Sequence, residues 1–352
     1  MAKTYSAGKS IEAIKKKYGL KKVIKLASNE NNYGLSPILK KKLQQQVSQV
    51  NLYPDNDYPS LKKAIADFYH VKNRNVLLGN GSDEILFVLL NYLLKEKDEV
   101  LLPTPSFQMY PLILKNNNKK FKSIKLKNWQ YDLEKFQQAI SSKTKMIILC
   151  NPNNPTGTYF SHKSLESFLK SIPKSIYVLL DEAYMDFADE DDFPNSLSLL
   201  KKYKNLIVLR TGSKFFGLAG LRFGFGFASN DIADLYYYYK LPFSINKLLE
   251  NLGPVLFKKQ SFYVKVKEKI LQEKEYLYAS FDALGIKYER SAANFIFLYN
   301  LNSKFLFEEL LKRGIIVREL ESFGVKGGLR VTVGRHWENK KFIKELKKIY
   351  ET

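Results

Sequence analysis

Between residues 77 and 229 the sequence alternates short apolar runs with amphipathic stretches, and this alternation constrains the fold more than any other feature. The runs read EVLLP, KMIILCNP, SIYVLLDEAY, NLIVLRTGS and RFGFGFAS. Runs that are apolar throughout are typical of strands buried on both faces, whereas strands with one solvated face alternate apolar and polar residues. The pattern predicts an α/β domain in which a mainly parallel sheet is flanked by helices.

The C-terminal third of the chain has a different pattern. A long helical region covers roughly residues 231–284, and strand-like NFIFLYN, GIIVREL and LRVTVG then alternate with helices at about 303–312 and 338–350. This mixture indicates a smaller α+β domain. We expect residues 1–40 to form an N-terminal arm and part of the small lobe, residues 41–284 the large domain with long connecting helices, and residues 285–352 the small C-terminal domain.

Length and composition limit the class of protein. A chain of 352 residues, 45% of them hydrophobic, can bury a large core in two lobes. The sequence has neither a signal-like start nor an apolar run long enough to span a bilayer, so we expect a cytoplasmic protein without a membrane partner. One cysteine, Cys150, excludes an internal disulfide. Three scattered histidines argue against a structural zinc site, and we expect no metal.

The net charge of +22 raises the question of a nucleic-acid partner. The lysines come in short clumps spread along the chain, for example at 15–17, 40–42 and 201–202, mostly on polar faces of expected helices. This distribution indicates a solvated surface, so we expect no nucleic-acid partner. Such a surface would attract an acidic or phosphorylated small substrate.

Polar side chains follow four of the apolar runs. Open α/β sheets bind ligands at the carboxyl ends of their strands, which makes these side chains candidate site residues. They are Asn151, Asn153 and Asn154 in CNPNNPTGT, Asp181, Glu182 and Tyr184 in VLLDEAY, Thr211, Ser213 and Lys214 in LRTGSK, and Gly79, Gly81, Ser82 and Asp83 in LLGNGSDEILFVLL.

The glycine-rich turn has two interpretations. Its backbone N–H groups and the positive end of the following helix would suit a phosphate. It would equally serve as an ordinary helix start, with Ser82 as the capping residue. GNGSDE is not a GxGxxG motif, and no GxxxxGK[ST] occurs in the chain, so neither a dinucleotide fingerprint nor a Walker loop is supported.

A buried carboxylate at Asp181 is costly unless it meets a cation or a donor, and a salt bridge to an arginine would satisfy it. Lys214 allows a sharper interpretation, because a partly desolvated lysine loses its proton readily and can form a Schiff base. Arg222, eight residues further on, could hold an anion in the same pocket. An anion cradle, an amine nucleophile and a buried carboxylate together match what pyridoxal phosphate requires.

A series of motifs supports this interpretation. The stretch 5–37, then LYPD, NPNNPTG, DEAY, SKFFGLAGLRFG, ANF and GIIVRE…LRVTVG…EN occur in one order along the chain. With them the chain resembles the fold-type I aminotransferases and, within these, the histidinol-phosphate aminotransferases, over nearly its whole length. The resemblance implies a fold-type I transferase fold, a large domain with a mainly parallel sheet plus a smaller α+β domain, and pyridoxal 5′-phosphate as cofactor.

The resemblance also implies residue roles at the cofactor ring. Lys214 would form the Schiff base and later carry a proton between the substrate carbon and C4′ of the cofactor. Asp181 would pair with the protonated pyridine nitrogen. Asn154 and Tyr184 would hydrogen-bond the phenolic oxygen, and Tyr110 in PSFQMY would stack on the ring face.

The cofactor phosphate would be held by a separate group of residues. By resemblance these are Ser82, Asp83, Ser213 and Arg222, with Tyr53 reaching in from a second subunit. That role for Tyr53 makes a homodimer the expected assembly.

The resemblance assigns two arginines to the substrate. Arg330 would grip the carboxylate of glutamate, and Arg318 would bind the distal anion of either substrate. The alternative for either arginine is a surface ion pair, with Glu319 the obvious partner of Arg318. Tyr5, in the N-terminal arm, would lie near the substrate.

We expect an aminotransferase that exchanges the amino group between L-glutamate and imidazole acetol phosphate by a ping-pong mechanism in histidine biosynthesis. Two alternatives stay open: an aminotransferase for another phosphorylated ketone or an aromatic amino acid, and a related amino-acid-phosphate decarboxylase. A regulatory domain would need an appended DNA-binding module, which the sequence does not offer. Asn32, Gly212, Arg335 and His336 depart from the family pattern, and we expect them near the substrate or its entrance.

Overall fold

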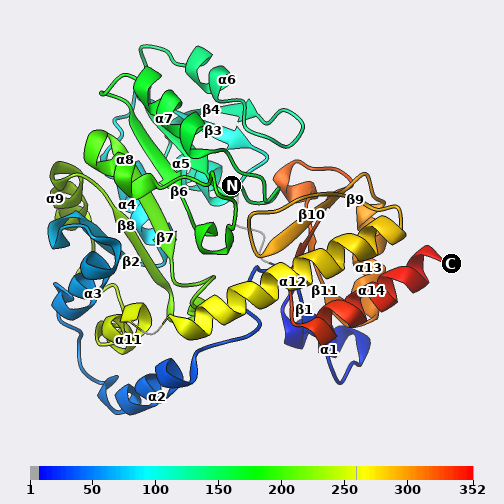
Figure 1. The fold of residues 1–352 in the computed structure, drawn as a ribbon. Helices are drawn as coiled ribbons and strands as arrows, with labels where there is room; N and C mark the ends of the chain where they lie inside the picture. Colours follow the sequence, from blue (N-terminus) through cyan, green and yellow to red (C-terminus); the bar gives the residue numbers. More distant parts are fainter. Residues whose placement is uncertain (1–7, 259, 352) are drawn as a thin grey trace.

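The large lobe of the computed structural model, which describes residues 8–258 and 260–351, is built on one seven-stranded sheet (Figure 1). Within it β8 runs antiparallel to both neighbours, and the other pairs are parallel. In spatial order the strands are β2 (Val76–Asn80), β8 (Phe223–Phe227), β7 (Leu206–Thr211), β6 (Tyr177–Asp181), β5 (Thr144–Cys150), β3 (Glu99–Thr104) and β4 (Lys120–Lys125).

Helices cover both faces of this sheet, because alternate residues of the central strands point into two separate apolar cores. In β6, for example, Val178 and Leu180 belong to one core and Leu179 to the other. One face is covered by α3 (Pro59–Tyr69), α7 (His162–Ser171) and α8 (Ser196–Lys202), and the other by α4 (Ser82–Tyr92), α5 (Met109–Asn116) and α9 (Asn230–Tyr239). The short α6 (Leu133–Gln138) packs against α7.

The small lobe has an antiparallel sheet in the order β12 (Arg318–Glu319), β13 (Leu329–Thr332), β10 (Phe295–Tyr299) and β9 (Lys287–Glu289). Packed with it are α1 (Ile11–Tyr18), α13 (Ser303–Lys312) and α14 (His336–Tyr350). The N-terminal β1 (Ile24–Lys25) pairs in parallel with β11 (Ile315–Ile316), so the start of the chain packs with its C-terminal part.

Three helices connect the lobes: α10 (Lys247–Glu250), α11 (Gly253–Lys258) and α12 (Ser261–Ala283). Figure 1 shows α12 running from the large lobe across to the small one. On the large-lobe side α11 packs against α3 and against α2 (Pro37–Gln46). The predicted fold class, a large α/β domain with a mainly parallel sheet plus a smaller α+β domain, is confirmed.

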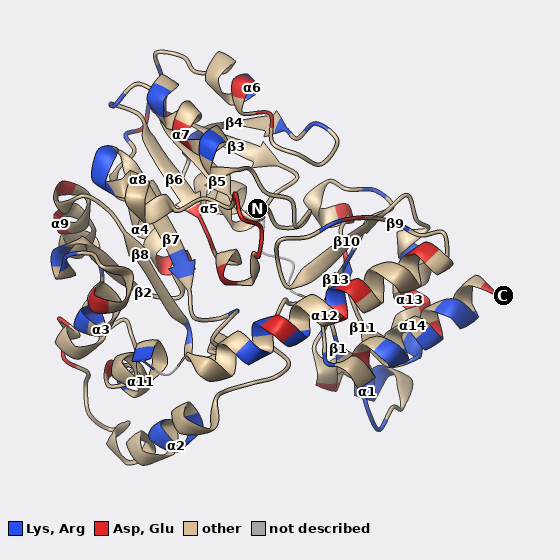
Figure 2. Ribbon diagram, viewed as in Figure 1, with Lys and Arg blue, Asp and Glu red and all other residues tan. Residues whose placement is uncertain are grey.

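Charged residues are distributed over the helices of both lobes (Figure 2). Many lysines pair with a carboxylate three or four residues away on the same helix, such as Lys63 with Asp67 and Lys341 with Glu345. None of the helices in the described ranges is long and apolar enough to cross a bilayer.

Candidate active site

The carboxyl ends of β5, β6 and β7 and the start of α4 meet at one place, and two neighbouring cavities open there. The smaller, of about 100 Å³, lies over the strand ends, and the larger, of about 420 Å³, lies towards the small lobe. Both are lined by Asp83, Phe107, Asn154, Tyr184 and Lys214. Residues that the sequence places far apart therefore share one continuous site.

The start of α4 forms one wall of the smaller cavity. Its N-cap is Gly81, not Ser82, and no side chain caps the helix, so the interpretation of Ser82 as a capping residue is wrong. The turn lies against β8 so closely that a Cβ on Gly224 would come within 2.1 Å of the Ser82 nitrogen. The positive end of α4 thus faces a cavity that Ser82 and Asp83 line.

Arg222 and Ser213 complete this wall. The Arg222 guanidinium lies 3.5 Å from the Ser213 hydroxyl and 3.5 Å from the Asp83 carboxylate. Its backbone is left-handed (φ 53°), and its carbonyl accepts from the Gly81 N–H at 2.8 Å, which fixes the arginine beside the glycine turn. A guanidinium, a hydroxyl and a helix N-terminus together make a site for a phosphate-sized anion.

Asp181 ends β6 and points into the smaller cavity. The Tyr110 hydroxyl donates to Asp181 Oδ2 at 2.6 Å, and the Ala183 N–H donates to Oδ1 at 3.1 Å. Burial raises the pKa of this carboxyl to about 6, although both hydrogen bonds lower it. A cationic ring nitrogen placed here would gain a buried anionic partner.

Lys214 follows β7 and contributes the amine. Its Nζ donates to the Ser28 carbonyl at 2.9 Å and lies 5.7 Å from the centre of the Tyr184 ring. Burial lowers the pKa of the amine to about 8, with a further lowering from Arg330. The lowered pKa increases the fraction of Lys214 that is neutral and nucleophilic near neutral pH.

Tyr184 and Asn154 line both cavities beside Lys214. Burial raises the pKa of the Tyr184 hydroxyl, so it stays protonated and can act as a donor. Its oxygen accepts from Asn29 Nδ2 at 3.0 Å. Asn154 Oδ1 accepts from Arg330 Nη1, which leaves its amide nitrogen available as a donor.

Two arginines from the small lobe face the larger cavity. Arg318 on β12 lies directly opposite Arg330 on β13, and both are buried. Arg330 Nη2 also donates to the Ala27 carbonyl at 2.7 Å. The Glu319 carboxylate, the alternative partner for Arg318, accepts from the Ser303 hydroxyl and the Glu321 N–H.

Tyr110 does not line either cavity, and its predicted stacking role needs correction. Its side chain is fully buried in the core beside α4, with the hydroxyl bound to Asp181. The aromatic ring in both cavity walls is that of Phe107, three residues earlier. The two rings contact each other edge to face, with centroids 5.4 Å apart, but Phe107 precedes α5 and lines the cavities whereas Tyr110 lies within the helix and is buried.

The outcomes for Tyr53, Tyr5 and Cys150 differ. Tyr53 is 80% exposed, packs at a tilt against the ring of Phe243 and lines neither cavity of its own chain. Tyr5 lies outside the described residues. Cys150 does line the smaller cavity, but burial raises the pKa of its thiol to about 12, which favours the predicted packing role.

The departures from the family pattern do not line the cavities. Asn32 donates to Glu338, and Arg335 donates to the Asn32 carbonyl, so both belong to a surface network at the start of α14. Gly212 faces Phe223, whose ring would lie 2.5 Å from a Cβ at that position. None of these three residues, nor His336, is among the residues that line either cavity, so their expected place near the substrate or its entrance stays a prediction.

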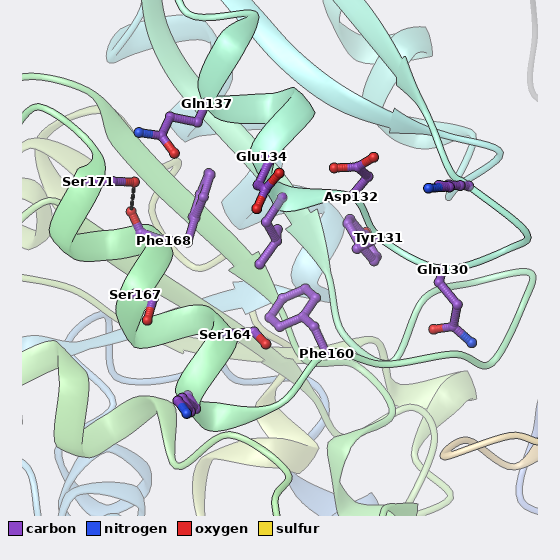
Figure 3. Close-up of a pocket in the computed structure, with 13 residues that line it drawn as sticks. Gln130, Tyr131, Asp132, Glu134, Gln137, Phe160, Ser164, Ser167, Phe168 and Ser171 are labelled. Carbon is purple, nitrogen blue, oxygen red and sulfur yellow. Dashed lines mark hydrogen bonds between the residues drawn. The ribbon is translucent and has the colours of Figure 1, made fainter.

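A further cavity, of about 700 Å³, lies between α6, α7 and the segment before α6 (Figure 3). It shares no lining residue with the two cavities described above. Asp132 and Glu134 lie on one side of it, and serines of α7 lie on the other. It contains none of the predicted site residues.

No role was predicted from sequence for three consecutive residues of the loop that joins β1 to α2. Ala27, Ser28 and Asn29 contact Arg330, Lys214 and Tyr184 respectively. These contacts bridge 155 to 303 residues of sequence, and two of them use backbone carbonyls. No local motif could have revealed them.

The donor set fits pyridoxal phosphate. An anion cradle, a buried carboxylate, an amine of lowered pKa and an aromatic wall line one cavity, and these are the kinds of group that a phosphate, a ring nitrogen, an aldehyde and a ring face require. The second cavity, with its two arginines, adjoins the amine and has room for an anionic substrate.

Comparisons with known proteins agree with this geometry. A model of the aminotransferase class I and II family matches residues 21–346. The chain is 40% identical over 351 residues to "Histidinol-phosphate aminotransferase 2" of Carboxydothermus hydrogenoformans, covering 99% of this chain and 97% of that protein.

Solved structures share the fold. A histidinol-phosphate aminotransferase from Sinorhizobium meliloti, in complex with pyridoxal-5′-phosphate, superposes with a TM-score of 0.91 at 21% identity, covering 98% of this chain and 95% of the other. An L-threonine-O-3-phosphate decarboxylase from Porphyromonas gingivalis superposes with a TM-score of 0.82 at 21% identity, covering 94% and 100%. The family match over most of the chain is decisive: the protein belongs to the class I and II aminotransferases, which are enzymes that depend on pyridoxal phosphate.

Proposed function

We propose that this enzyme transfers an amino group between L-histidinol phosphate and 2-oxoglutarate, giving imidazole acetol phosphate and L-glutamate. The observation that carries the proposal is the pair of buried arginines, Arg318 and Arg330, on the wall of the cavity that Lys214 also lines. L-histidinol phosphate carries a phosphate and 2-oxoglutarate carries carboxylates, so each substrate has an anionic group for these arginines to bind. A relative 40% identical to the chain is named "Histidinol-phosphate aminotransferase 2".

In this proposal the cofactor phosphate lies between the start of α4 and Arg222, held by Ser82, Asp83, Ser213 and Arg222. Asp181 pairs with the ring nitrogen, Asn154 and Tyr184 donate to the phenolic oxygen, and Phe107 stacks on the ring. When bound, pyridoxal phosphate withdraws electrons from the substrate carbon that loses or gains a proton. The distances around Asp181 and Arg222 support these positions.

Lys214 binds the cofactor and, once displaced by substrate, moves the proton. Its amine has a lowered pKa of about 8, which is close to neutral pH. It can therefore both accept a proton from the substrate carbon and give it back. Asp181 keeps the ring nitrogen protonated because the pair excludes water and the anion is already in place.

The two arginines orient the substrate. Arg330, held by Asn154 and the Ala27 carbonyl, binds the carboxylate of glutamate. Arg318 binds the distal anion, which is the phosphate of histidinol phosphate in one half-reaction and the side-chain carboxylate of glutamate in the other. One cavity then serves both half-reactions.

A homodimer completes the proposal. The segment after α2 exposes Val47, Val50, Leu52 and Tyr53, and Phe243 packs against Tyr53 at 4.8 Å. An apolar strip of this kind supports a second copy of the chain as its partner, with Tyr53 reaching the partner's phosphate cradle. Light scattering on a sizing column should give twice the mass of one chain, and a monomer at micromolar concentration would contradict this.

The test is the absorption spectrum of the holoenzyme, first with L-glutamate and then with L-histidinol phosphate. Conversion of the pyridoxal-type band to the pyridoxamine-type band by both compounds is the expected result. Conversion by glutamate alone would move the proposal to another amino acceptor. Release of CO2 from a phosphorylated amino acid, without conversion by glutamate, would favour the decarboxylase instead.

The substrate assignment has its own variant. Arg318→Gln should raise KM for histidinol phosphate by about 10- to 100-fold, the effect of losing hydrogen bonds to a charged group. Arg335→Gln is the matched control, because this exposed arginine lines neither cavity. Equal losses for phosphorylated and unphosphorylated amines in Arg318→Gln would contradict the assigned role.

A further inference from the structure

Asn29 links the small lobe to the Tyr184 hydroxyl. It is buried, with 1% of its surface exposed, and it follows β1 in a left-handed conformation (φ 54°). Its Nδ2 lies 3.0 Å from the Tyr184 hydroxyl oxygen, and its backbone carbonyl accepts from Asn294 Nδ2 at 3.2 Å. Two segments distant in sequence thus hold this one residue in place.

Thr332 on β13 fixes which way the Asn29 carboxamide is turned. The Thr332 hydroxyl oxygen accepts from the Asn29 backbone N–H at 2.9 Å. Its own proton then has Asn29 Oδ1, 3.2 Å away, as its acceptor. Because Oδ1 must receive that proton, the NH2 group of the carboxamide faces Tyr184.

The position of the Tyr184 hydroxyl proton follows from the same assignment of donors and acceptors. A tyrosine hydroxyl has one proton to donate, and here its oxygen already accepts from Asn29. Asn29 Nδ2 cannot accept, so the Tyr184 proton cannot return along this contact. Within the described ranges no other side chain takes it, and Tyr184 lines both cavities, so the proton points into the site.

We infer that Asn29 is a positioning residue: by donating to the Tyr184 oxygen, it holds the Tyr184 hydroxyl proton towards the cofactor's phenolic oxygen. The inference rests on the proposed role of Tyr184, and it adds a residue that the sequence did not single out. Arg330 and Thr332 lie two residues apart on β13 and share a face, so the strand that carries the substrate arginine also sets this proton.

The consequence is a lower pKa for the nitrogen that joins the cofactor to Lys214. A donor aimed at the phenolic oxygen stabilises its anionic form. The neighbouring nitrogen then contributes less by staying protonated, so it loses its proton at a lower pH. Losing the orientation of one hydrogen bond should therefore raise this pKa by about 0.4–1 pH units, which corresponds to one net hydrogen bond.

The experiment titrates the absorption band of the holoenzyme with pH, in the absence of substrate. Asn29→Gly removes the carboxamide at a backbone position that glycine adopts without strain, and it should shift the spectral midpoint upward by that amount. Thr332→Val, which removes the hydroxyl that orients the carboxamide, should shift it in the same direction. Thr332→Ser is the matched control and should leave it in place.

Tyr184→Phe separates positioning from general disturbance. In this background there is no Tyr184 hydroxyl for Asn29 to orient, so adding Asn29→Gly should cause no further shift of the spectral midpoint. An unshifted midpoint in Asn29→Gly, with the cofactor bound at full stoichiometry, would overturn the inference, as would an equal shift in the Tyr184→Phe background. Neither result depends on histidinol phosphate, whereas failure of the wild type to bind cofactor would defeat the proposed function itself.

Discussion

Two neighbouring carboxylates at the end of β6 lie in opposite kinds of surroundings. Asp181 faces the cofactor cavity and accepts hydrogen bonds from the neutral donors Tyr110 and Ala183. Glu182 points to the other side of the sheet, where Arg210 donates to Oε2 at 2.8 and 3.0 Å and the Ser196 hydroxyl at 2.9 Å. Consecutive residues of a strand alternate sides, so one residue step separates the two surroundings.

The difference shows how a buried charge becomes available for chemistry. Glu182 and Arg210 neutralise each other inside the core, and Arg210 also lies 4.7 Å from the centre of the Tyr69 ring. Burial raises the pKa of both carboxyls, but Glu182 already has its cation in Arg210, whereas Asp181 lines the site cavity, where a ligand cation can offset the cost. The Glu182 cluster therefore stabilises the fold, whereas Asp181 can bind the cationic ring nitrogen of a ligand.

The largest expected effect is on the stability of the closed cluster. Arg210→Met should leave Glu182 buried without its cation and lower the free energy of unfolding by about 3–5 kcal/mol. Urea denaturation followed by circular dichroism measures this loss. Turnover per folded molecule should be unchanged, because Arg210 lines neither cavity of the site.

A substitution in the cluster that faces the cofactor should act on catalysis. Asp181→Asn keeps the shape and the Tyr110 contact but removes the charge, and it should lower kcat by about 10²–10³-fold, the usual loss for one group that stabilises developing charge. Single-turnover kinetics with saturating glutamate measure this step. If Asp181→Asn instead unfolded the protein while Arg210→Met stopped catalysis, the assignment of the two clusters would be reversed.

The pH dependence of stability separates the clusters without any substrate. In the cofactor-free protein the folded pKa of Asp181, about 6, lies above its ordinary value of 3.8. The folded state therefore holds this proton more tightly, and stability falls as the pH rises from about 4 to about 6. Asp181→Asn lacks this fall and should gain on the order of 1–3 kcal/mol over the wild type across that window.

Lys214 titrates in a different window and serves as an internal check. Its folded pKa of about 8 lies below the ordinary 10.5, so stability rises between these values as the unfolded chain gives up its extra proton. This rise should be the same in wild type and Asp181→Asn. Thermal melts at half-unit pH steps measure both windows, and identical curves from pH 4 to 6 would contradict the shifted pKa of Asp181.

Much of this arrangement could be predicted from local sequence. Apolar runs define the strands, and the polar residue after each run lies at a strand end, so Asn154, Asp181 and Lys214 could be placed in one site before the fold was known. The salt bridge that was the alternative explanation for Asp181 does exist, but one residue further, at Glu182. Which of the two carboxylates faces the arginine depends on the register of β6, and the composition of the segment does not reveal that register.

What could not be predicted depends on contacts across the fold. Asn29 acts on Tyr184 and Thr332 over 155 and 303 residues of sequence. Phe107 and Tyr110 differ by less than one helical turn, and only the point where α5 begins decides which ring lines the cavity. Gly212 is explained by Phe223, which occupies the space where a side chain would lie.

The smallest expected effect concerns Tyr110, whose hydroxyl is the link between Asp181 and the core. Tyr110→Phe removes a hydrogen bond that lowers the pKa of Asp181, so the carboxyl should ionise at a higher pH than about 6, by about one pH unit or less. The fall in stability of the cofactor-free protein should still begin near pH 4 but should continue to a correspondingly higher pH. Tyr131→Phe is the matched control, since this buried hydroxyl contacts Cys150 and Asn153 instead.

Both substitutions delete one buried hydroxyl and should cost similar stability at pH 4, where Asp181 is mostly protonated. They should diverge between pH 5 and 7, because only Tyr110→Phe changes how tightly Asp181 holds its proton. Parallel curves for the two variants over this range would show that Tyr110 fills space without tuning the charge. A divergence that disappears when Asp181→Asn is added would place the effect of Tyr110 on that carboxylate, and so would identify the contact through which the core adjusts the cofactor's buried anion.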